Sequence, residues 1–160
     1  MMNKTAERVV PLDKGRVDVY TENGITLYAY QTCDPIDNEV FVLARNGRGV
    51  VIELPCFYDN IRELTGFLAA EGIRVEGKLV AYHAAGASFL PEVPAYGTAS
   101  SAAYNTTGGG AALVANFKNA FGDSFDAGLC SVDRVMEEGE VEIAGIRFVV
   151  KPNAEAYDLE

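Results

Sequence analysis

Any catalytic chemistry in this chain would be organised around His83, the only histidine among 160 residues. It directly follows the largely apolar stretch 78–82, and the carboxyl ends of strands are where α/β proteins build their sites. A histidine that acts as a general base needs a nucleophile within reach, and the candidates are Ser88, Tyr82 and Cys56. A sole histidine at a strand end is more often a hydrogen-bonded structural residue. The sequence leaves both interpretations open.

Two loops carry other polar groups that could bind ions. Residues 33–38 place the thiol of Cys33 beside the carboxylates of Asp34 and Asp37, which would suit a hard metal or acid–base work. Asp-Pro and Asp-Asn are also ordinary turn sequences, and we favour that interpretation. The glycines at 108–110 precede an expected helix, whose N-terminus would favour an anion. No phosphate-binding motif surrounds them, so they indicate a flexible loop.

The composition is that of an ordinary globular protein, with 49% apolar and 22% charged residues. The net charge of -10 repels phosphate backbones and anionic lipids, so we expect no nucleic acid and no membrane as partner. No apolar run approaches the ~20 residues that cross a bilayer, and residues 1–16 lack a signal-peptide core, which favours a cytoplasmic protein. Cys33, Cys56 and Cys130 fit neither a disulfide framework nor a paired-cysteine zinc site, and we expect them to be buried thiols.

The first part of the chain has the pattern of consecutive strands. The expected strands cover 17–21, 25–32, 39–44 and 49–54. Asn-Gly dipeptides at 23–24 and 46–47 mark hairpin turns. Stretches 40–44 and 50–54 are almost continuously apolar, which predicts strands covered on both faces of a central sheet.

An amphipathic helix is expected next. Its apolar face consists of Phe57, Ile61, Leu64 and Leu68. Asn60 and Glu63 make a capping pair at its start, and Gly72 is placed where the helix should end. A strand over 78–82 then completes a strand–helix–strand crossover, which places the two strands parallel.

Shorter elements are expected in the rest of the chain. They are a strand over 95–97, a helical turn over 100–104, a helix over 111–121 and strands over 132–136, 140–144 and 146–151. No internal repeat or linker is present. We therefore expect one domain, 1–160, of the α/β class, with a mixed β-sheet flanked by helices.

The order of these elements, together with several short segments, resembles the N-terminal half of the metallo-β-lactamase superfamily. The resembling segments are NEVFVL (38–43), GVVIELP (49–55), the helix after them, LVAYH (79–83), AYGT (95–98), DRVMEEG (133–139) and IRFVVKP (146–152). The resemblance covers residues 16–160 and implies a metallo-β-lactamase-like sandwich or half-sandwich. It also implies a domain incomplete at its C-terminus, since the family supplies further ligands from a second half. A sheet edge exposed by a missing half would favour a homodimer.

Members of that family carry the motif His-x-His-x-Asp-His after the strand that ends here at Tyr82, and those side chains hold one or two metals, commonly zinc, that activate a water for hydrolysis. The corresponding six residues here are HAAGAS (83–88). His83 matches the first histidine, whereas Ala85, Ala87 and Ser88 stand where the second histidine, the aspartate and the last histidine would be. Zinc needs three or four donor atoms, and alanine offers none. The resemblance therefore implies a degenerate metal site.

Two carboxylates add weaker correspondences to the resemblance. Glu53 lies where the family often has a strand-end aspartate. Glu155 lies near a later ligand, because a glutamate in a similar Glu-Ala setting approaches the metal in the alkyl-sulfatase-like branch. His83 and Glu155 are thus the candidate ligands for zinc or another divalent metal if the degenerate site functions. Otherwise we expect no cofactor.

Three functions are consistent with these observations. The first is a metallo-β-lactamase-fold protein that has lost the metal site and the hydrolase activity and keeps a non-catalytic binding or structural role. The second is a divergent metal-dependent hydrolase, with His83 near Glu155 and a site completed by a missing C-terminal half or by a dimer partner. The third is a small-molecule binding module that uses a cleft between His83, the glycines at 108–110 and Cys56.

Overall fold

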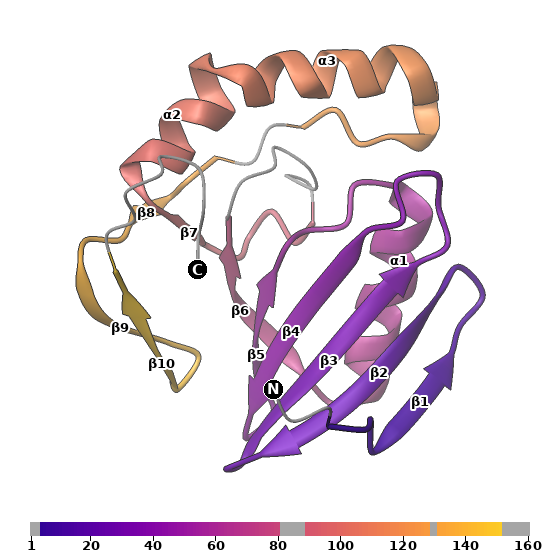
Figure 1. The fold of residues 1–160 in the computed structure, drawn as a ribbon, viewed down its shortest axis with the longest axis vertical. Coiled ribbons are helices and arrows are strands. Elements are labelled where there is room, and N and C mark those ends of the chain that lie inside the picture. The colour runs from indigo at the N-terminus through magenta and orange to yellow at the C-terminus, as the bar shows by residue number, and fades with distance from the viewer. Residues whose placement is uncertain (1–3, 81–88, 129–130, 152–160) are drawn as a thin grey trace.

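The computed structural model describes residues 4–80, 89–128 and 131–151. Its strands are β1 (Arg8–Pro11), β2 (Gly15–Glu22), β3 (Ile25–Thr32), β4 (Glu39–Arg45), β5 (Arg48–Ile52), β6 (Arg74–Leu79), β7 (Ala95–Gly97), β8 (Arg134–Val135), β9 (Gly139–Ile143) and β10 (Ile146–Val150). Its helices are α1 (Tyr58–Ala70), α2 (Ala99–Thr107) and α3 (Gly109–Phe121), followed by the 3-10 turn η1 (Gly122–Ser124). Strands β1 to β8 form one sheet in chain order, and β9 and β10 pair separately (Figure 1).

The sheet is mixed, as the sequence predicts. Strands β1 to β5 pair antiparallel, and β5 to β8 pair parallel. The turn residues Asn23 and Asn46 have positive φ angles of 53° and 52°, and each precedes a positive-φ glycine. Two positive φ angles in a row match the hairpin turns expected of Asn-Gly. The parallel β5–β6 pair confirms the crossover through α1.

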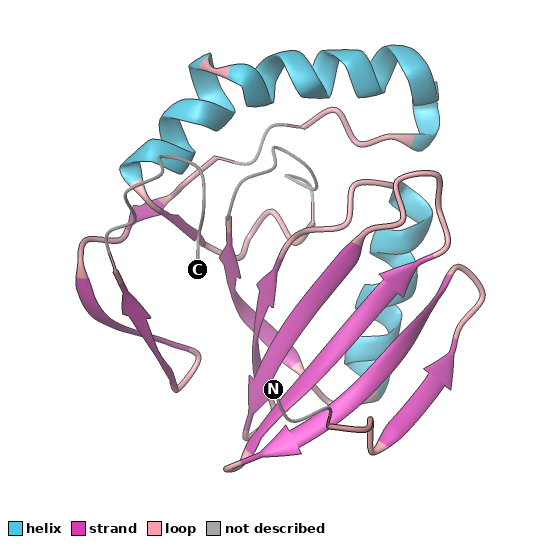
Figure 2. Ribbon diagram, viewed as in Figure 1, coloured by secondary structure: helices cyan, strands magenta, loops and turns pink. Residues whose placement is uncertain are grey.

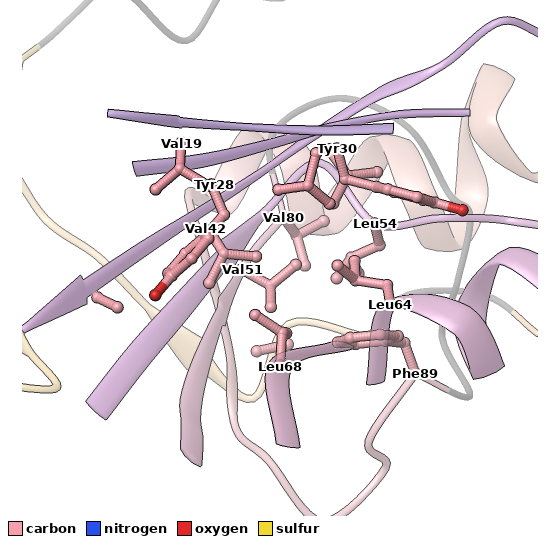
Figure 3. Packing of buried hydrophobic residues seen from close by; sticks show 14 residues of the cluster. Val19, Tyr28, Tyr30, Val42, Val51, Leu54, Leu64, Leu68, Val80 and Phe89 are labelled. Carbon is pink, nitrogen blue, oxygen red and sulfur yellow. The ribbon is translucent and has the colours of Figure 1, made fainter. Parts of the chain in front are cut away.

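Helix α1 covers one face of the sheet with the apolar side chains that the periodicity predicts. Leu64 and Leu68 are buried against Val42, Tyr30 and Val51 of the strands (Figure 3). Chain reversal after the helix occurs at Gly72, whose φ is +72°. Burial of this face supplies the main hydrophobic stabilisation of the fold.

The β9–β10 hairpin lies on the opposite face of the sheet, over β5 to β7. Ile143 and Ala144 of the hairpin region form a buried cluster with Val50 and Tyr96. A Cβ atom added at Gly77 of β6 would lie 2.5 Å from the Ile143 side chain, so glycine is needed for this close approach. Helices α2 and α3 run one after the other beyond the ends of the strands (Figure 2).

Several sequence predictions need correction. The N-cap residue of α1 is Phe57 and no side chain caps it, whereas Asn60 is buried within the helix, so the expected Asn60–Glu63 capping pair is wrong. The glycines at 108–110 are not a flexible loop, because α3 begins directly after α2 at this point. A Cβ on Gly110 would approach the Tyr104 carbonyl oxygen to 3.0 Å, which explains a small residue there. Strand β1 was not anticipated.

None of the described helices is long and apolar enough to cross a membrane.

Candidate functional site

The carboxyl ends of β5, β6 and β7 meet at one edge of the sheet because these three strands are parallel. Chain segments that follow them at this edge include Glu53 to Phe57 after β5 and Thr98 after β7. The chain returns to this region at Phe89 and Leu90, whose carbonyl oxygens accept hydrogen bonds from the buried Lys78 Nζ at 3.0 and 3.1 Å. This edge is where the sequence predicts the site.

The residues on which the predicted metal site depends lie outside the described ranges. They are His83, Ala85, Ala87, Ser88 and Glu155. The structure therefore does not test whether His83 approaches Glu155, nor whether either binds a metal. Cys130 also lies outside the described ranges.

Glu53 occupies an unusual backbone position at this edge. Its φ angle is +57°, in the left-handed region that non-glycine residues seldom adopt. Such a conformation persists only where the surrounding structure holds it, and it is found more often at active sites and ligand-binding sites than elsewhere. The strand expected over 49–54 is β5, which ends at Ile52, so Glu53 directly follows the strand.

Cys56 is a buried thiol, as predicted, with 2% of its surface exposed. Burial raises its pKa to about 12, and the neighbouring carboxylate of Asp34 acts in the same direction. At neutral pH this thiol is therefore protonated, which argues against its use as a nucleophile for His83. Cys33, in contrast, is exposed, so the expectation that it is buried is wrong.

Asp126 is a buried acid beside Cys56 that no sequence motif indicates. Its backbone N–H donates to the Cys56 carbonyl oxygen at 2.9 Å, and its side chain is 2% exposed. One carboxylate oxygen, Oδ1, accepts from the Gly128 amide at 2.8 Å. The other, Oδ2, has no hydrogen-bond partner within the described part of the chain. A buried acceptor of this kind is costly unless something satisfies it.

A cavity of about 420 Å³ lies between the β3–β4 loop, the first turn of α1 and the end of α3. Pro35, Phe57 and Phe121 give it an apolar surface, and Lys14 and Arg62 bring positive charge. Its size is within the range typical of small-molecule sites. The residues that line this cavity differ from those of the cleft predicted from the sequence, which were His83, the glycines at 108–110 and Cys56.

Acidic and polar residues complete the lining of this cavity. Asp34 Oδ1 accepts from the amides of Ile36 and Asp37 at 2.8 and 3.0 Å, which confirms the interpretation of this loop as turn chemistry. Cys33 lines the same cavity. The residues expected to form either a metal site or a turn thus form a turn that borders a cavity.

Asn60 lines the cavity and also forms a hydrogen bond with a residue of the core. Its Nδ2 donates to the Tyr30 hydroxyl at 3.0 Å, and that hydroxyl donates to Glu63 Oε1 at 2.9 Å. Burial is the main reason why the pKa of Tyr30 lies well above its usual value. The burial of Asn60 could have been predicted from the sequence, because position 60 is one helical turn before the buried Leu64 and lies on the same face of the helix.

Side chains that could bind a metal are not clustered in the part of the chain that the structure describes. Within residues 4–80, 89–128 and 131–151, no three histidine, cysteine, aspartate or glutamate side chains are grouped so that they could hold a metal ion. The positions at which the resemblance expects three further ligands, Ala85, Ala87 and Ser88, lie outside the described ranges. The described side chains therefore offer no group of donors that fits zinc.

Comparisons with known proteins connect this arrangement to a fold. No family model and no curated protein matches the sequence. Among solved structures, the metallo-β-lactamase from Erythrobacter litoralis aligns with 82% of this chain and 54% of its own, with 6% identity and a TM-score of 0.53. The metallo-β-lactamase FIM-1 from Pseudomonas aeruginosa, in its mono-zinc form, aligns over 76% and 51% of the two chains, with 7% identity and a TM-score of 0.50.

The chain spans about half the length of these solved structures. At such low identity the match concerns the fold alone. The mixed sheet, the crossover helix α1 and the order of the elements agree with it. The chain therefore has an α/β architecture of the metallo-β-lactamase fold.

Proposed function

We propose that this chain is a metallo-β-lactamase-fold protein that does not hold the family's zinc and acts by binding rather than by hydrolysis. The observation that carries the proposal is the sequence HAAGAS at 83–88. Three of the four ligands of the resembling motif are replaced there, by Ala85, Ala87 and Ser88. A methyl group cannot coordinate a metal, and a zinc site with one remaining histidine loses its affinity.

Metal content tests this proposal. The full chain is purified without chelator or affinity histidines and its zinc, manganese and iron are measured before and after incubation with each metal. We expect much less than one equivalent of each. The matched control is His83→Ala, which should have the same low content. Near-stoichiometric metal that disappears in His83→Ala would overturn the proposal and favour a divergent metal-dependent hydrolase, with Glu155→Gln as the next variant.

The cavity beside α1 supports a second candidate, a small-molecule binding module. It combines an apolar surface with two cationic side chains, Lys14 and Arg62, with three carboxylates, Asp34, Asp59 and Asp123, and with the buried amide of Asn60. A ligand that binds only the folded protein raises its melting temperature, by an amount that grows with ligand concentration. Thermal scans with a broad set of small anionic, cationic and zwitterionic compounds should show a shift that Arg62→Ala reduces. No shift with any compound would count against this candidate.

A further inference from the structure

The face of the sheet opposite α1 divides into two halves. Over β5 to β7 the β9–β10 hairpin covers it, with Val50 and Leu79 packed against Ile143 and Phe148. Over β2 to β4 the equivalent side chains are Tyr20, Leu27, Phe41 and Leu43, each only partly buried. None of these four belongs to a buried apolar cluster of the described residues. We call this second half the open face.

Strand pairing defines the open face. Directly paired residues point to the same side of a sheet. One cross-strand row is Val9, Asp18, Ala29, Phe41 and Ile52, and the next is Tyr20, Leu27, Leu43 and Val50. The second row thus runs without interruption from the open face to the buried Val50 under the hairpin. The apolar surface of the established sheet–hairpin contact continues onto the open face.

The sequence pattern of β4 is typical of a strand that is covered on this face as well. Residues 40–44 are all apolar, which is typical of a strand buried on both sides. The structure buries Val40, Val42 and Ala44 under α1 but leaves Phe41 and Leu43 half-buried. On the same face, Val9 is 54% exposed. A hollow of about 400 Å³ also lies there, lined by Leu27 and Leu43 among others.

Charged residues mark the four corners of the open face. Arg16 and Glu39 belong to the cross-strand row of Gln31 at one end. At the other end, Glu22 is the last residue of β2 and Arg45 the last of β4. All four are exposed, and two of them also pair within the chain, Arg16 with Asp18 at 2.9 Å and Glu22 with Lys4 at 3.3 Å. Like charges are therefore diagonal to each other across the face.

This corner pattern is self-complementary under two-fold symmetry. A two-fold axis parallel to the strands lays β2 over β4 of the second copy, which brings Glu22 against Arg45 of the partner subunit and Arg16 against Glu39 of the partner subunit. An axis perpendicular to the strands brings Arg16 against the partner's Glu22. Either arrangement places unlike charges together around a centre that is apolar except for Asp18, as in isologous interfaces.

We propose that a second copy of this chain packs on the open face, so that two sheets stack face to face in a symmetric dimer. Aligned sheets of this kind pack about 10 Å apart with interdigitated apolar side chains. The homodimer expected from the sequence would form through an exposed sheet edge. The apolar side chains and the charges described above favour contact through the open face instead.

The size of the face sets the expected affinity. Strands of seven or eight residues are about 25 Å long, and three strands are about 14 Å wide. This is a small interface by the standards of stable complexes, so we expect a reversible dimer with a Kd in the micromolar range. The net charge of each copy opposes association, which makes the dimer weaker at low salt than at about 0.15 M salt.

Sedimentation equilibrium of the full chain, from about 5 to 500 µM, tests the proposal with two matched variants. Val9→Lys places a charge on β1 at the border of the open face, where Val9 pairs with Asp18 of β2, and Val149→Lys makes the same change at a valine of almost equal exposure, 53%, on β10. We expect Val9→Lys to raise the Kd about tenfold or more, and Val149→Lys to leave it within about twofold. Both valines are largely exposed, so both variants should fold, which circular dichroism checks.

Charge reversal adds a second test and identifies the axis. Arg45→Glu should weaken the dimer by placing like charges together. Adding Glu22→Arg restores it if the axis is parallel to the strands, and adding Glu39→Arg restores it if the axis is perpendicular. A chain that stays monomeric at 500 µM would overturn the proposal, as would a dimer that Val149→Lys weakens as much as Val9→Lys does, or one that neither double variant restores.

Discussion

The hydroxyl of Tyr30 connects the sheet to α1 and the cavity, and its removal gives a sharp test of the structure. Tyr30 and Asn60 are both buried. Tyr30→Phe keeps the ring but deletes the hydrogen bonds to Asn60 Nδ2 and Glu63 Oε1. Asn60 Nδ2 then retains only a contact of 3.5 Å with the Lys14 carbonyl oxygen. A buried donor without a good partner costs ~1–3 kcal/mol, so we expect a loss of about 2 kcal/mol in the free energy of unfolding.

Urea unfolding at pH 7, followed by far-ultraviolet circular dichroism, measures this loss. The matched control is Tyr58→Phe, the same change at a tyrosine that is 41% exposed, which should alter stability by less than ~0.5 kcal/mol. Tyr30→Phe combined with Asn60→Leu should recover part of the loss, because no buried donor is then left without a partner. A Tyr30→Phe variant as stable as Tyr58→Phe would refute the reasoning.

Three further predictions concern the core, pH and the cysteines. Leu64 is fully buried, so Leu64→Ala should cost ~2–5 kcal/mol in the same unfolding assay, and a cost below ~1 kcal/mol would contradict the packing of α1. The hydrogen bond from Arg8 lowers the pKa of Glu71 below its usual 4.5, so the stabilisation by this carboxylate is fully present above pH 4.5 and is lost as the pH falls through the lowered pKa. Glu71→Gln should therefore be less stable than wild type at pH 7, and this difference should shrink as the pH falls below 4.5. Iodoacetamide at pH 8 should modify Cys33 in the folded protein and Cys56 only after unfolding, as read by peptide mass spectrometry, and equal labelling would contradict the burial of Cys56.

Local sequence patterns predicted most of the fold because burial follows periodicity. The apolar spacing of Leu64 and Leu68 located α1, and the Asn-Gly turns located the hairpins between β2 and β3 and between β4 and β5. The prediction of a flexible loop at glycines 108–110 was wrong, because their small size allows close packing at the junction of α2 and α3 as well as it would suit a loop. The short strand β1 carries Val9 and Pro11 but too few residues for a periodic signal.

The site was harder to predict because its residues come together only through tertiary contacts. Asp126 lies far from Cys56 in the sequence, yet its amide bonds to the Cys56 carbonyl. The cavity joins the β3–β4 loop to the end of α3, which no local spacing can reveal. The apolar run at 40–44 predicted coverage on both faces, and the half-buried Phe41 and Leu43 are what led to the proposed dimer.

The claim that this metallo-β-lactamase fold lacks the family's zinc is tested most directly by restoring the missing donors. Isothermal titration with zinc compares the wild-type chain with a variant that carries Ala85→His, Ala87→Asp and Ser88→His. We predict that the wild-type chain shows no stoichiometric binding, whereas the restored variant binds zinc. Tight binding of one equivalent by the wild-type chain would contradict the proposal that the metal site has been lost.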